Sequence, residues 1–283
     1  MTGFTRALRG EAYLLTRRRG YRWALAAVFL TALLHALGSW ILLEMNHRAG
    51  GPGPGESGDW NFWPRFASSA RAGMFPVELF LVGLIAAAFP RETGTGSVRD
   101  PLVRGISRAA LVSARSVAAL ARPLVLGGAA IVAAALGSSL CFEAGDVMEE
   151  GFAIFDEAEV RTEVMRALGH GFPALLALGA LAVFVSAWLA RGAVAVATGI
   201  AIVLLPGILP GGLSSWAPWM FTSTLPGLGK ESYLEKAAEF AAGYADALPR
   251  SFESVITAGW IAPWPALLLF LGAAILVFRK RDL

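Results

Sequence analysis

Few side chains in this 283-residue sequence have types and spacing that could support catalysis. One long apolar segment contains His35, with Ser39 one helical turn further on, and a later segment contains His170. An intramembrane enzyme needs a nucleophile beside a base, paired aspartates or a zinc motif such as H-E-x-x-H. No such arrangement occurs, so we interpret both histidines as hydrogen-bonding contacts between packed helices.

ATP hydrolysis is not predicted for this chain. A phosphate-binding loop reads G-x-x-x-x-G-K-[ST], and the nearest string, "LPGLGKES", lacks the first glycine at the required spacing. The single cysteine, Cys141, excludes an internal disulfide, and three histidines make a structural metal site unexpected. We therefore expect no catalytic residue, no metal and no cofactor in this chain.

Glu78 is the charged side chain of greatest interest, because it interrupts the apolar run at residues 72–89. We expect it about six residues, roughly 9 Å, below the outer end of the second span. Two interpretations are open: its carboxylate reaches the lipid headgroups, or it lines a substrate path. The sequence carries no charged motif that would identify a substrate.

The elements that position these residues are long apolar segments. The chain is 56% hydrophobic and only 16% charged, a composition that is rare in soluble domains. A membrane helix needs about 20 apolar residues. We predict an all-α polytopic membrane protein whose single domain covers residues 1–283. Its six predicted spans cover about residues 21–44, 71–90, 116–142, 167–190, 192–211 and 257–278.

The distribution of charge predicts how the spans are oriented. The two end segments and the segments after spans two and four hold 16 of the 24 basic residues and only four acids. The remaining connecting segments hold eight basic residues and sixteen acids. By the positive-inside rule, both termini are cytoplasmic. The arrangement is that of a multi-pass protein in the bacterial inner membrane.

Two outer segments have distinct compositions. Residues 143–166 are acidic with interspersed apolar residues, which predicts a short amphipathic helix at the outer surface. This helix presents a solvated negative face or attracts a cation or basic partner. Residues 213–229 are uncharged but are broken by Pro218 and Pro226, so we expect an interfacial or re-entrant segment there.

The segment between spans two and three is basic and amphipathic. Val98, Leu102, Val103 and Ile106 share one face of a predicted helix over residues 96–108. Such a helix could lie on anionic lipid headgroups, or it could dock on a cytoplasmic partner.

This stretch resembles the corresponding loop in permease subunits of type 2 ABC exporters. That loop reads Glu, a few residues, then G-T-L-x-x-L-L-x-x-P-[IV]-S-R. The matching residues here are Glu92, Gly96, Leu102, Ile106, Ser107 and Arg108, while Pro101 and Gly105 depart from the pattern. Residues 4–19 resemble the family's amphipathic elbow helix, with Phe4, Leu8, Ala12 and Leu15 on one face. The ending "AAILVFRKRDL" is also similar to family endings.

The resemblance implies a permease without an ATPase of its own, coupled through a cytoplasmic helix to separate ABC ATPase subunits that hold ATP and Mg. It assigns coupling to Glu92, Gly96, Arg99, Leu102, Arg104, Ile106, Ser107 and Arg108, with Glu92 paired to an arginine as a hinge anchor. Further expected partners are a second permease copy or paralogue, membrane lipid and a periplasmic companion, and not nucleic acid. The alternative is a non-enzymatic membrane scaffold or sensor of the same topology.

Overall fold

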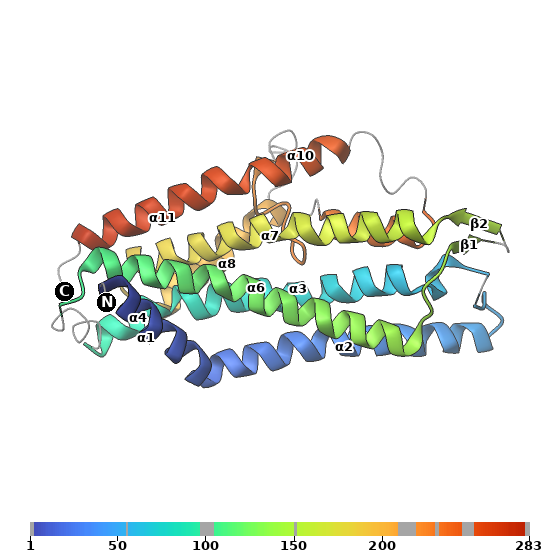
Figure 1. Cartoon of the computed structure of the whole chain (residues 1–283), viewed down its shortest axis with the longest axis horizontal. Coiled ribbons are helices and arrows are strands. Elements are labelled where there is room, and N and C mark those ends of the chain that lie inside the picture. The colour runs from blue at the N-terminus through green and yellow to red at the C-terminus, as the bar shows by residue number, and fades with distance from the viewer. Residues whose placement is uncertain are drawn as a thin grey trace.

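Long helices that run side by side dominate the structure (Figure 1). The computed structural model describes residues 3–54, 56–96, 105–149, 152–208, 219–229, 232–244 and 252–280. The elements, in order, are α1 (Gly3–Arg17), α2 (Arg19–Arg48), η1 (Gly58–Trp60), α3 (Phe62–Ala86), α4 (Ala88–Gly94), α6 (Arg108–Cys141), β1 (Val147–Glu149), β2 (Phe152–Phe155), α7 (Glu157–Trp188), α8 (Gly192–Ile208), α9 (Tyr233–Ala241), α10 (Glu253–Ile261) and α11 (Pro263–Lys280). Helix α1 and the end of α11 lie at one end of the bundle, and the β1–β2 hairpin lies at the other (Figure 1).

Five helical stretches in the described residues are long and apolar enough to cross a membrane. They are α2, α3 with α4, α6, α7, and α10 with α11. The prediction of a helical protein with several potential spans is therefore confirmed. The fifth predicted span corresponds to α8, whose 17 described residues extend about 25 Å. Residues 209–211 of that predicted span lie outside the described residues.

Several helices begin well before the predicted spans. Helix α3 begins at Phe62 because Asn61 caps it, with Asn61 Oδ1 accepting from the N–H of Trp63 at 3.0 Å. Helix α6 begins at Arg108, where Ser107 Oγ accepts from the N–H of Ala110 at 3.2 Å. These polar caps lie outside the apolar windows, so hydropathy alone places the helix starts too late.

The prediction of one outer helix over residues 143–166 is wrong. This segment also contains two β-strands, which the predicted all-α class did not include. Strands β1 and β2 form an antiparallel hairpin in this segment, with Val147 fully buried. The remaining acidic residues form the first turns of α7, which begins at Glu157. The N–H of Glu157 donates to Asp146 Oδ1 at 2.9 Å, and this bond joins the hairpin to the helix.

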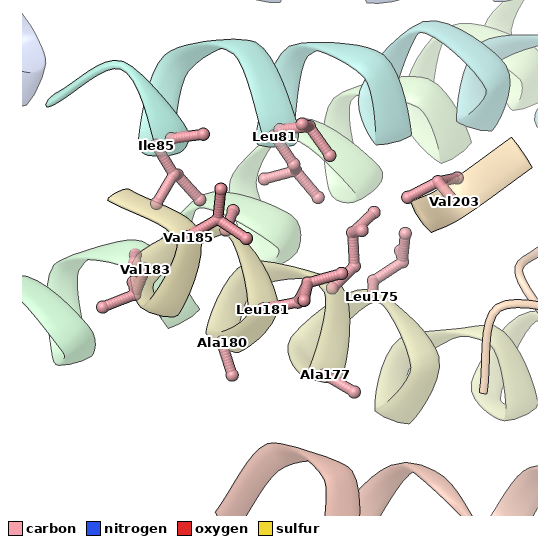
Figure 2. Close-up of a cluster of buried hydrophobic side chains, with 14 of the residues drawn as sticks. Leu81, Ile85, Leu175, Ala177, Ala180, Leu181, Val183, Val185 and Val203 are labelled. Atoms are coloured by element: carbon pink, nitrogen blue, oxygen red, sulfur yellow. The ribbon is translucent and has the colours of Figure 1, made fainter. Parts of the chain in front are cut away.

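Helix α7 is the central helix of the core. Among the candidate spans its most apolar window is 78% buried, against 17% for α2. Figure 2 shows Leu175 and Leu181 of α7 close to Leu81 of α3 and Val203 of α8. Ala177 lies on the side of α7 turned toward α11. Helix α2 instead exposes large apolar side chains such as Leu42, which suits contact with lipid.

Candidate functional site

Helix α1 brings a buried acid to the end of the bundle that holds both termini. The predicted apolar face includes Ala12, but Ala12 is exposed, whereas Ala7 and Glu11 are only 6% and 7% exposed. Phe4 and Leu8 are half-buried, so the buried face is rotated toward Glu11. A carboxylate is tolerated in this position because it meets an arginine of α6.

That arginine is Arg115, which is 8% exposed and is the centre of an ion-pair cluster. Its Nε donates to Glu11 Oε1 at 2.8 Å, and its Nη2 donates to Glu92 Oε2. The other oxygen of Glu92 accepts from Arg18 Nη2 at 2.8 Å. The Arg115 guanidinium also lies over the Phe89 ring, 4.2 Å from its centroid. The cluster therefore joins α1, the α1–α2 junction, α4 and α6.

Glu92 lies in α4, before the segment that joins α4 to α6, and Arg115 lies in α6, after it, so their ion pair connects the two ends of this segment. Gly96 and Gly105 have φ angles of +73° and +80°, a region that favours glycine, so the backbone turns sharply at both residues. The pairing of Glu92 with an arginine, which the resemblance implies, is present in the structure.

The other predicted coupling residues are placed only in part. Arg99, Leu102 and Arg104 lie outside the described residues, as does the side chain of Arg108. Ile106 is half-buried against the core of this chain, and Ser107 caps α6.

The predicted helix over residues 96–108 is wrong at both ends. Gly96 and Gly105 have positive φ angles, and Ser107 has an extended backbone, with φ −67° and ψ 151°. Residues 97–104, between these two glycines, lie outside the described residues. A left-handed backbone conformation interrupts an α-helix, so neither Gly96 nor Gly105 can lie inside one.

Glu78 is fully buried and forms a second polar site, in the middle of the bundle. Its Oε1 accepts from the N–H of Gly227 at 2.6 Å and its Oε2 from the N–H of Leu228 at 2.8 Å. Because α3 begins at Phe62, Glu78 lies sixteen residues, about 24 Å, along this helix. The burial rules out the interpretation in which the carboxylate reaches the headgroups.

The segment that binds Glu78 covers residues 219–229, of which 221–226 are buried and lie mainly in turns. Leu225 is fully buried, and a Cβ on Gly227 would lie 2.4 Å from the backbone nitrogen of Phe75. A Cβ on Gly171 of α7 would lie 3.0 Å from Pro226 Cγ. The segment is thus wedged between α3 and α7, where Glu78 satisfies two of its backbone N–H groups. A re-entrant segment was predicted for residues 213–229, of which 213–218, with Trp216, lie outside the described residues.

Both histidines contact neighbouring helices, as predicted. His35 Nδ1 lies 3.1 Å from Ser69 Oγ of α3. His170 Nε2 lies 3.1 Å from the carbonyl oxygen of Ile256 in α10, so the ring must carry its proton there. These contacts assign the histidines to helix packing.

Tyr233, at the start of α9, is a buried residue that the sequence did not single out. Its side chain is 1% exposed, and its hydroxyl donates to Glu163 Oε1 of α7. Burial, together with the hydrogen bond to Glu163 and the negative charge of that carboxylate, raises the pKa of the Tyr233 phenol well above its ordinary value. The contact fastens α9 to the N-terminal part of α7.

Within the described residues, no three acidic, histidine or cysteine side chains are grouped so that they could hold a metal ion. The described residues form a helical bundle with five helices long and apolar enough to cross a membrane, an ion-pair cluster at one end and a buried carboxylate in its middle. No protein-family model matches the sequence, and comparison with curated proteins gives no significant match.

Proposed function

We propose that the chain is the membrane-spanning permease subunit of an ATP-driven exporter of the type 2 ABC class. It would act with a second permease copy or a paralogue and with two cytoplasmic ATPase subunits. The observation that carries the proposal is the cluster around Arg115, because it joins the segment between spans two and three to the helices on either side. The sequence resemblance supports the same role for this segment.

A coupling segment needs a stiff connection to the spans. The Glu92–Arg115 pair holds both ends of the segment together, so that a partner pushing on residues 97–104 would move α4 and α6 as one body. Helix α6 has 34 residues and extends about 51 Å, so its displacement would reach the opposite end of the bundle. Glu11 extends the same body to α1.

Movement of α3 would also reach the Glu78 site. The two hydrogen bonds from Gly227 and Leu228 hold the 219–229 segment against α3, close to the core shared with α8. In the proposed mechanism, ATP closes the ATPase pair, the coupling segment shifts and the spans open a path outward. Release of the 219–229 segment from Glu78 would be one step of that opening.

The energy would come from another polypeptide, since the sequence lacks a phosphate-binding loop. A direct test is co-purification of the tagged chain in mild detergent from its own cells. We expect a soluble protein with a phosphate-binding loop to co-purify, identified by mass spectrometry. Its ATPase activity should change when it is bound to the permease in proteoliposomes.

The matched variant is Arg104→Glu/Arg108→Glu, and the control is Arg48→Glu/Arg161→Glu at the opposite end of the bundle. We expect the first variant to lose most of the bound ATPase and the control to retain it, with both inserted normally. Full ATPase binding by the first variant would refute docking through this segment. A scaffold or sensor of the same topology would co-purify without any ATPase.

A further inference from the structure

A cavity of about 350 Å³ lies where α1 joins α2, at the end of the bundle that holds both termini. Its polar lining residues are Arg18, Arg19, Tyr21, Arg91, Glu92 and Arg122, and its apolar lining comes from Gly20, Leu84, Ala87 and Ala88. Four arginines against one glutamate give the lining an excess of positive charge. Because Glu92 is already paired with Arg18 and Arg115, little of its charge remains to balance the other arginines.

Arg122 is the residue that points to a ligand. It lies in α6, is 6% exposed, and its Nε has no hydrogen-bond partner. Among the described residues Arg122 forms no ion pair. The acid with the strongest influence on it is Glu11, which is already bonded to Arg115. A buried guanidinium with an unsatisfied Nε and no ion pair among the described residues is costly, so an anion in this cavity would stabilise the fold.

The surroundings of the cavity favour an anion that also carries apolar chains. Tyr21 and Leu84 are among its lining residues, and Trp23, two residues along α2, is 75% exposed. Aromatic side chains at this position are typical of the headgroup level of a membrane. Beyond Trp23, α2 exposes Leu30 and Leu34, along which acyl chains could lie.

We propose that this cavity binds the phosphate-bearing headgroup of an anionic membrane lipid. Arg122 contacts the phosphate from the buried side, and Arg19 and Arg91 contact it from the exposed rim, since arginine matches phosphate in both charge and geometry. Basic pockets between spans on the cytoplasmic side are suited to such headgroups. The proposal requires only that the chain lies in a membrane, and it is independent of a transport role.

Lipid retention can be measured on the full-length protein, delipidated in a mild non-ionic detergent. Phosphatidylglycerol, phosphatidylcholine and glycerol 3-phosphate are added separately, and bound molecules are counted by native mass spectrometry. We expect phosphatidylglycerol to bind and to raise the thermal midpoint, and the other two to have little effect. A response to glycerol 3-phosphate equal to that to phosphatidylglycerol would overturn the lipid assignment in favour of a soluble phosphate.

Arg122→Gln should weaken phosphatidylglycerol binding about tenfold, equivalent to about 1.4 kcal/mol, because it removes a charged hydrogen-bond donor to the phosphate. The matched control is Arg6→Gln, an exposed arginine of α1 outside the cavity, which should bind as the wild type does. Arg19→Gln/Arg91→Gln removes only exposed side chains and tests the site even if Arg122→Gln fails to fold. Wild-type binding by Arg19→Gln/Arg91→Gln, or by a folded Arg122→Gln, would refute the proposal.

Discussion

Glu92 and Arg115 form an ion pair across the two ends of the segment that joins α4 to α6. Arg115 also binds Glu11, so one guanidinium holds the first helix, the end of the second potential span and the start of the third. Both carboxylates come from elements that precede Arg115 in the chain, and all three side chains are largely buried. The cluster therefore holds α1, α4 and α6 together and so fixes where the segment between α4 and α6 begins and ends.

Arg115→Gln is expected to lower the free energy of unfolding by about 3–5 kcal/mol, because Glu11 would remain buried without its ion-pair partner. The measurement is unfolding of the purified protein in increasing dodecyl sulfate, followed by circular dichroism. Arg48→Gln is the control: Arg48 pairs with Glu44 but is 76% exposed, and its loss should cost under about 0.5 kcal/mol. Similar losses for the two variants would contradict a stabilising cluster.

Glu78→Gln is expected to destabilise the protein by about 1–3 kcal/mol, since the amide NH₂ would face a backbone N–H of Gly227 or Leu228 and leave it unsatisfied. Glu235→Gln, which removes a half-exposed carboxylate that pairs with Arg71, should cost less. Hydrogen exchange should show faster exchange at residues 225–229 in the Glu78 variant only. Unchanged exchange there would mean that the carboxylate does not hold the segment.

A pair of glycine substitutions tests how closely the 219–229 segment packs on α3. Gly227→Ala places a Cβ 2.4 Å from the backbone nitrogen of Phe75 and should destabilise the protein by about 1–3 kcal/mol. Gly128→Ala in α6 meets nothing within 4 Å and should stabilise the helix by up to about 1 kcal/mol. A lower thermal midpoint for Gly227→Ala and a higher one for Gly128→Ala, each relative to the wild type, would support this packing. An unchanged midpoint for Gly227→Ala would argue against it.

The centres of the long helices were predictable from sequence, because an uncharged apolar window of about 20 residues is typical of a membrane-spanning helix. Their ends were not, since caps such as Asn61 and Ser107 lie in polar sequence beyond the windows. The hairpin at Val147–Phe155 was missed because an acidic segment with scattered apolar residues fits a helix pattern as well as a strand pattern.

The polar sites depend on contacts between distant parts of the chain. Glu78 and Gly227 are 149 positions apart, and nothing in the local sequence of either indicates the other. The arginines of α6 offered a usable signal: Arg108, Arg115 and Arg122 are spaced by seven, which places them on one helix face. That stripe predicts a basic face at the start of α6, although which acids it meets depends on the tertiary fold.

The buried phenol of Tyr233 predicts a loss of stability at high pH. Its pKa is raised in the folded state, so the folded protein keeps a proton that the unfolded chain releases near pH 10. The stabilisation is complete below about pH 10 and declines as pH rises toward the folded-state pKa. Thermal midpoints between pH 8 and 11 should fall more steeply for the wild type than for Tyr233→Phe. Parallel curves would exclude Tyr233 as the titrating group.

Orientation in the membrane decides whether the segment between α4 and α6 can meet an ATPase at all. In a Cys141→Ala background, Thr95→Cys and Ala144→Cys each place a thiol at an exposed position, at opposite ends of the bundle. The excess of basic residues near Thr95 predicts a cytoplasmic location for that end. A membrane-impermeant maleimide should therefore label Ala144→Cys in intact cells, and Thr95→Cys only after the cells are opened. Labelling of Thr95→Cys in intact cells would place the segment outside the cell, where no ATPase could drive it, and the exporter proposal would fail.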